Sequence, residues 1–190
     1  MKTRLALAAA LLFAAPLAQA QSFSFAAGLG PEVTGATGGG AVFVTVDTLA
    51  QTLTLDSIWF GLSGGTTVAH IHCCTATPGT GFVGVAVSPP TLPGFPTGTT
   101  FGNYEVTLNL ASNATYGAGF LAASGGTAAG ASARLLAGLA TGTAYFNVHS
   151  STFTGGEIRG FLQPVPEPAT WGLMALGVAA VGVAARRRQG

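Results

Sequence analysis

The stretch AVFVTV, residues 41–46, follows Gly38-Gly39-Gly40 and places valine at every second position. Successive side chains of a strand point to opposite faces, so this spacing predicts a strand with one buried face. Glycine- and proline-rich turns separate further runs of this kind, at residues 51–55, 57–60, 67–72, 81–87, 103–110, 143–148 and 157–162. Many short strands with regular turns predict an all-β fold, an antiparallel β-sandwich or barrel-like structure with Greek-key character.

One segment of the body has a different pattern. In AAGASARLLAGL, residues 128–139, leucines recur at helical spacing and predict one short helix. Charged residues make up only 7% of the chain, far below the roughly 25% of ordinary soluble domains. Residues 21–163 carry two arginines and no basic cluster, which argues against a nucleic-acid partner.

The N-terminal 20 residues read as a targeting segment. Lys2 and Arg4 precede an apolar stretch that ends in Ala18-Gln19-Ala20, a small-residue cleavage pattern. This order predicts a secretory signal helix at residues 1–20 and a mature β domain at 21–163.

The segment 164–190 has three ordered parts. The motif Val165-Pro166-Glu167-Pro168 precedes an uncharged apolar stretch, residues 169–185, and then the basic tail Arg186-Arg187-Arg188. A membrane span needs about 17–25 residues, and arginines after it stay on the cytoplasmic side. The pattern predicts a C-terminal transmembrane helix that anchors the exported domain in the inner membrane.

Together these three parts resemble the PEP-CTERM sorting signal of Gram-negative bacteria. The resemblance implies recognition by an exosortase-type membrane enzyme and cleavage near the Pro-Glu-Pro motif. It also implies delivery to the cell surface or to an exopolysaccharide matrix, so that the membrane anchor is transient.

Four stretches of the body resemble the CHRD domain, an all-β extracellular module first named from chordin. In order they are LGPEVTGATGGGAVFVTVD from residue 29, AHIH at 69–72, AYFNVHS at 144–150 and GGEIRGFL at 155–162. Enzymatic activity is not a hallmark of the family, and no catalytic residues are expected here. Many members follow AHIH with Gly-Pro, where this chain has Cys73-Cys74.

The three histidines of the chain form the candidate site. His70 and His72 are two residues apart on a predicted strand and therefore share a face. If the strands of AHIH and FNVH pair, His149 joins them, and three imidazoles suit Zn or Cu. The alternative is a hydrogen-bonded layer in which the histidines lock neighbouring strands together with Asn147, Glu157 and Arg159. Glu157 and Arg159 are also two apart, which favours an ion pair between them over acid–base chemistry.

Cys73 and Cys74 are the only cysteines, and an exported protein meets an oxidising environment. A disulfide between adjacent cysteines is uncommon, because normal disulfides span a larger Cα separation. With an even count and no other cysteine as partner, a Cys73–Cys74 disulfide is nevertheless the favoured prediction. The alternatives are free thiols that join His70 and His72 as metal ligands, or bonds to another chain. The sequence therefore predicts a non-enzymatic surface module or, alternatively, an extracellular metal-binding protein with possible redox activity.

Overall fold

The valine run lies in the middle of a sheet in the computed structural model, which describes residues 22–166. Strand β2 (Gly39–Asp47) pairs along its length with β1 (Ser22–Pro31) on one side and β3 (Thr52–Phe60) on the other. Strand β6 (Gly102–Asn109) continues this part of the sheet beside β3. All of these pairings are antiparallel; consecutive strands are joined in the pairs β1–β2 and β2–β3, whereas β4 and β5 intervene in the chain between β3 and β6.

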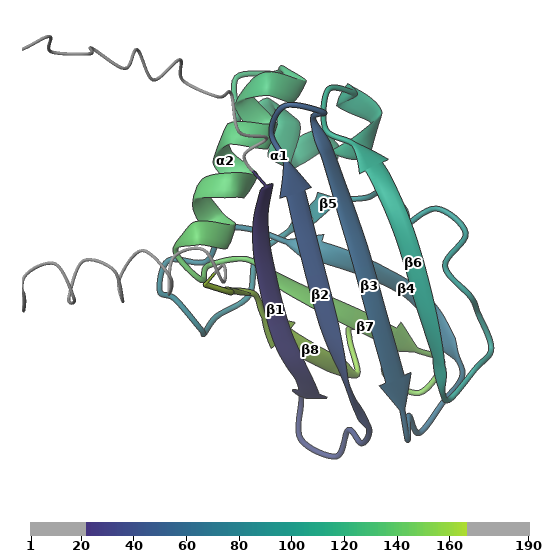
Figure 1. Cartoon of the computed structure of the whole chain (residues 1–190). Coiled ribbons are helices and arrows are strands. Elements are labelled where there is room, and N and C mark those ends of the chain that lie inside the picture. Colours follow the sequence, from purple (N-terminus) through teal and green to yellow (C-terminus); the bar gives the residue numbers. More distant parts are fainter. Residues whose placement is uncertain (1–21, 167–190) are drawn as a thin grey trace, which may run out of the picture.

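The remaining strands form the facing part: β4 (Thr66–His72), β5 (Val85–Val87), β7 (Tyr145–Ser150), β8 (Ile158–Phe161) and β9 (Gln163–Pro164). The strand order is β5-β4-β7-β8-β1-β2-β3-β6, and β9 pairs with β1. The chain crosses to this part after β3, returns for β6 and crosses again before β7. The whole sheet is curled into a half-barrel (Figure 1).

Strand β1 joins the two parts. One edge of it pairs with β2 from Ser22 to Leu29. The other edge pairs with β8 at Gly30 and Pro31, and with β9 at Phe25 and Ala26.

The core lies between the two parts of the sheet. Alternate residues of β2 and β3 are buried, including Val44, Leu53 and Leu55 at 0% exposure, and Ile71 and Phe146 face them from β4 and β7. Helix α2 (Ala128–Ala140) adds Leu135 and Leu139 to this core at one end of the half-barrel (Figure 1). The Thr127 side chain caps its N-terminus by accepting from the Gly130 N–H.

The antiparallel all-β class and the helix that starts at Ala128 are confirmed. The sequence patterns do not predict β1, the five-residue helix α1 (Ala118–Ala122) or the single 3₁₀ turn at Asn113–Thr115. Residues 81–87 form a strand only from Val85, and the two predicted strands at 51–55 and 57–60 form one continuous strand, Thr52–Phe60. No helix within residues 22–166 has the length and apolar character that a membrane crossing requires. The predicted signal helix and transmembrane helix lie outside the described residues.

Candidate metal centre

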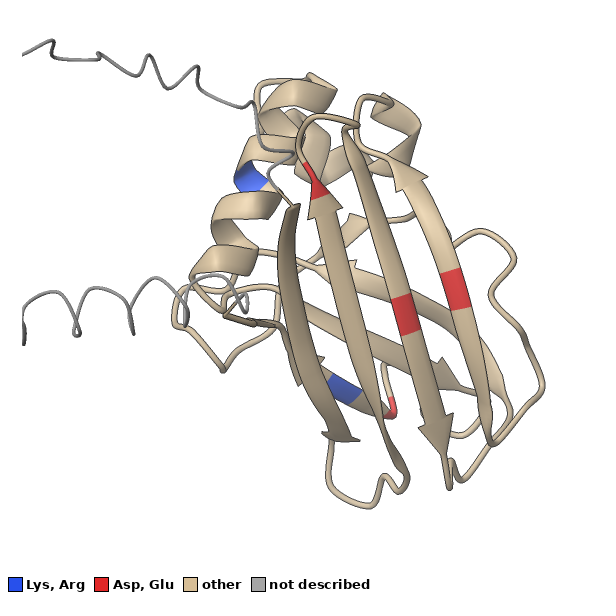
Figure 2. Ribbon diagram, viewed as in Figure 1, with Lys and Arg blue, Asp and Glu red and all other residues tan. Residues whose placement is uncertain are grey.

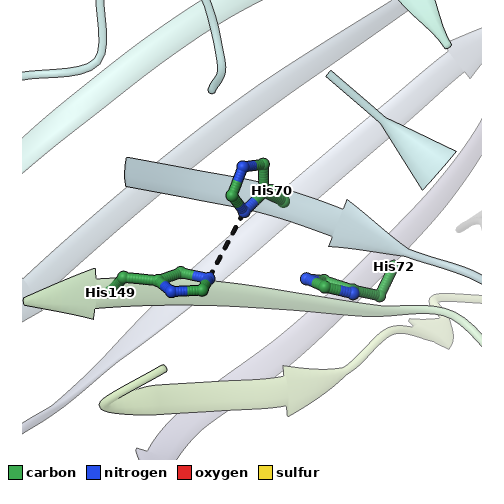
Figure 3. Close-up of side chains that lie close together, drawn as sticks. All are labelled: His70, His72 and His149. Atoms are coloured by element: carbon green, nitrogen blue, oxygen red, sulfur yellow. Dashed lines mark hydrogen bonds between the residues drawn. The ribbon is translucent and has the colours of Figure 1, made fainter. Parts of the chain in front are cut away.

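Pairing of β4 with β7 brings the three histidines together. In this register Ile71 lies opposite Phe146 on the core side, and His70 lies opposite Asn147 on the other face. His72 shares the face of His70, and His149 projects from β7 beside them (Figure 3). All three are buried, at 7%, 8% and 9% exposure for His70, His72 and His149.

Each imidazole is held by one backbone carbonyl. His70 Nε2 lies 2.7 Å from the Pro90 oxygen, His72 Nδ1 lies 2.7 Å from the Val83 oxygen, and His149 Nδ1 lies 2.7 Å from the Thr154 oxygen. A carbonyl oxygen can only accept, so the ring nitrogen that faces it carries the hydrogen. The second nitrogen of each neutral ring is therefore a lone-pair donor to any cation.

These lone-pair nitrogens converge. His70 Nδ1 lies 3.3 Å from His149 Nε2, and one nitrogen from each of the three rings lies within 4.8 Å of the others. With the tautomers set by the carbonyls, neither nitrogen of the 3.3 Å pair has a hydrogen to give the other. His72 Nε2 is buried with no hydrogen-bond partner.

One pair of these nitrogens already has the spacing of a metal site. Zinc–imidazole bonds are about 2.0–2.1 Å long, so two nitrogens of a tetrahedral site lie roughly 3.3 Å apart, as His70 Nδ1 and His149 Nε2 do. The His72 ring, whose nitrogen lies within 4.8 Å of the other two, must move closer before one ion can bind all three. Metal-bound histidines usually donate their other N–H to a carbonyl or carboxylate, and all three rings here do so. One group competes with a metal: the Asn147 amide lies 3.0 Å from His149 Nε2 and donates to its lone pair.

Burial favours the neutral form of His70 and His72. The pKa of His70 falls to about 4, chiefly through burial, with the neighbouring His149 and His72 adding to the fall and the Pro90 carbonyl opposing it. Burial likewise lowers the pKa of His72. Metals bind neutral imidazole, so protons compete weakly for these two ligands near neutral pH.

A polar layer borders the histidines, but its composition differs from the prediction. Asn147 donates to Glu32 Oε2 at 3.3 Å, and the Arg159 guanidinium lies 3.8 Å from Glu32 Oε1. Burial raises the pKa of Glu32, partly offset by Asn147, Arg159 and His149.

Glu157 is not part of this layer. Its Oε1 accepts from the backbone N–H and hydroxyl of Ser63, at 2.6 and 2.7 Å, and Arg159 pairs with Glu32 instead. The reason is that Glu157 precedes β8 and directs its side chain toward the loop after β3, while its own carbonyl accepts from the Glu32 N–H. Glu32 lies in the first of the four stretches that resemble the CHRD domain, but nothing in that stretch links it to Arg159, because their contact depends on the pairing of β1 with β8.

Cys73 and Cys74 form a disulfide directly after β4. Neither cysteine belongs to the histidine cluster. The bridge lies against helix α2, where a side chain at Gly138 would collide with both sulfurs.

The sorting residues fall only partly within the described chain. Val165 donates its N–H to the Ser24 carbonyl at 2.8 Å, and Pro166 is the last described residue. Glu167, Pro168, Arg186, Arg187 and Arg188 lie outside it.

Comparison with protein families gives two matches. The model of the CHRD domain matches residues 13–162, and that of the PEP-CTERM protein-sorting motif matches residues 164–188. Comparison with curated proteins and with solved structures found no match.

Proposed function

The chain belongs to the CHRD domain family and ends in a PEP-CTERM motif, and from this premise we propose an exported module that binds a transition metal at His70, His72 and His149. The motif assigns the chain to exosortase-type sorting of exported proteins. The proposal adds two points to this assignment: that the module binds a metal and that it is delivered to the surface matrix.

The convergence of three lone-pair nitrogens supports metal binding. A purely structural layer gains stability when each buried polar atom has a partner, because an orphaned one costs about 1–3 kcal/mol. Here His70 Nδ1 receives no hydrogen from His149, and His72 Nε2 has no partner, whereas His149 Nε2 accepts from the Asn147 amide. A cation bound by the three nitrogens would give the lone pairs of His70 and His72 a partner, in exchange for the bond from Asn147 to His149.

The ligand set favours Zn or Cu. Imidazole nitrogens suit both metals, whereas Mg and Ca prefer oxygen ligands. The Asn147 amide must release His149 when a metal binds, since one lone pair cannot serve both.

The test is metal binding by protein purified without chelators. Mass spectrometry of the metal content should give one Zn or Cu per chain, and Co²⁺ should give the visible absorption of a tetrahedral nitrogen site. The variant His70→Ala/His72→Ala should lose both signals. Asn147→Ala, which frees the lone pair of His149, should keep or strengthen Co²⁺ binding.

Two outcomes contradict the proposal. One is a protein that takes up no Zn, Cu or Co²⁺ under these conditions. The other is metal binding that survives in the double-alanine variant while that variant remains folded by circular dichroism. Either result leaves the histidines as a hydrogen-bonded layer of a non-enzymatic surface module.

Processing provides the test of the sorting proposal. We propose a signal peptide at residues 1–20, a mature domain at 21–163 and a sorting segment at 164–190, with the span at 169–185 as a transient anchor. The intact mass of the surface form should correspond to cleavage near residues 165–168. Replacement of Arg186–Arg188 by alanine should retain the uncleaved precursor. An unchanged C-terminus in the surface form would contradict the assignment.

A further inference from the structure

A cleft of about 530 Å³ opens beside the disulfide, away from the histidine lone pairs. Its walls come from four separate segments: the bridge Cys73–Cys74, Val83–Val85, Gly117–Phe120 with Ala123, and Arg134. Most of these groups are apolar or glycine, so the surface offered to a ligand is largely apolar.

Arg134 of helix α2 is the charged group of this cleft. Its guanidinium lies 4.9 Å from the centre of the Phe120 ring, which also lines the cleft. Among residues 22–166, no carboxylate and no hydrogen-bond acceptor is paired with this guanidinium. The other arginine of the domain, Arg159, is paired with Glu32 and with the Gly81 carbonyl.

Arg134 has no carboxylate partner even though carboxylates outnumber arginines in the described residues. The described residues contain two arginines and five carboxylates, and the acidic positions of β3 and β6 lie midway along their strands, away from the helices (Figure 2). Asp47 is used within its own turn, where it accepts from Leu49 and Ala50. A guanidinium presents five N–H donors in a fork that matches a carboxylate.

We propose that the cleft binds a small organic carboxylate with a flat apolar body. The body would lie on the disulfide and Phe120, and the carboxylate would pair with Arg134. The two halves of this ligand correspond to the two halves of the cleft: apolar walls, and one cation that contacts the Phe120 ring but has no carboxylate partner among residues 22–166.

The glycines of the cleft allow a clean steric test. A Cβ at Gly119 would meet no atom within 4 Å, so a larger side chain there projects into open space rather than into the core. Leucine also favours the helix over glycine. Gly119→Leu should therefore obstruct the cleft without unfolding the protein.

The experiment compares 2-naphthoate with 2-naphthol, which share a ring system and differ in the anionic group. Binding to the metal-stripped protein is followed by amide NMR, with Gly117 and Gly119 as reporters. The naphthoate should bind at one saturable site. Arg134→Gln should weaken it about tenfold or more, and Gly119→Leu should abolish binding. The naphthol should bind more weakly and should not respond to Arg134→Gln.

Three results would overturn the proposal. These are no saturable binding of 2-naphthoate at millimolar concentration, equal affinity in Gly119→Leu, or equal affinity in Arg134→Gln. Melting curves of both variants establish that they are folded. Arg134→Lys keeps the charge but not the fork and should bind with intermediate affinity.

Discussion

Replacing Gly138 by alanine tests how the disulfide packs against helix α2. A Cβ at this position would lie 2.7 Å from Cys74 Sγ and closer still to Cys73 Sγ, with Thr143 Oγ1 at 3.4 Å. In an open helix the change from glycine to alanine stabilises by about 0.5–1 kcal/mol. Overpacking a filled site costs about 1–3 kcal/mol. Two sulfurs fixed by one covalent bond place this site in the upper part of that range, so Gly138→Ala should lower stability by about 1–2 kcal/mol net.

The assay is denaturant unfolding under oxidising conditions, with Gly119→Ala as the matched control. Gly119 also lies in a helix, but a Cβ there meets nothing within 4 Å, so this variant should be as stable as the wild type or more stable. In a Cys73→Ala/Cys74→Ala background the sulfurs are gone, and Gly138→Ala should become neutral or stabilising. The double-mutant cycle should therefore give a coupling of about 1–3 kcal/mol. A Gly138→Ala protein at least as stable as the wild type, or an equal loss in both backgrounds, would refute the reasoning.

Three further predictions concern the charge, the core and one turn of the domain. Because burial lowers the pKa of His70 from 6.5 to about 4, the unfolded chain binds the proton first as the pH falls. The metal-free protein should therefore lose stability between these two pH values, and urea midpoints for His70→Gln should show a shallower slope. Phe146→Ala, at a site with 0% exposure, should cost about 3–5 kcal/mol, whereas Phe101→Ala, at 73% exposure, should change thermal unfolding by less than about 0.5 kcal/mol. Asp47→Ala removes the acceptor for two turn amides and should cost about 1 kcal/mol in denaturant unfolding, most of which Asp47→Asn should recover.

Local pattern was enough to predict most of the strands and the shared face of His70 and His72. Alternation of valine in β2 and of His, Ile and His in β4 is a two-residue signal, and strand geometry turns it directly into a buried face. The pattern does not predict strand β1, because its second half, AAGLGP, lacks the β-branched and aromatic residues that are typical of strands. Helix α1 is only five residues long, too short to show a period.

The site needed information that local pattern does not contain. His149 meets His70 only because β7 pairs with β4, a strand some 80 residues earlier, and the prediction could state this pairing only as a condition. Glu32 and Arg159 meet through the pairing of β1 with β8, so neither sequence neighbourhood indicates the other. The carbonyls of Val83, Pro90 and Thr154 hold the rings from loops, and a backbone carbonyl leaves no signature in residue type.

Val83 belongs to both proposed sites. Its carbonyl holds His72 in the tautomer that presents Nε2 to a metal, and the same residue forms part of the cleft wall beside the disulfide. A carboxylate that shifts this wall would change the affinity of the histidines for a metal. By thermodynamic linkage the metal must change the affinity for the carboxylate by the same factor. One peptide carbonyl would thus make the proposed metal site responsive to the proposed organic ligand.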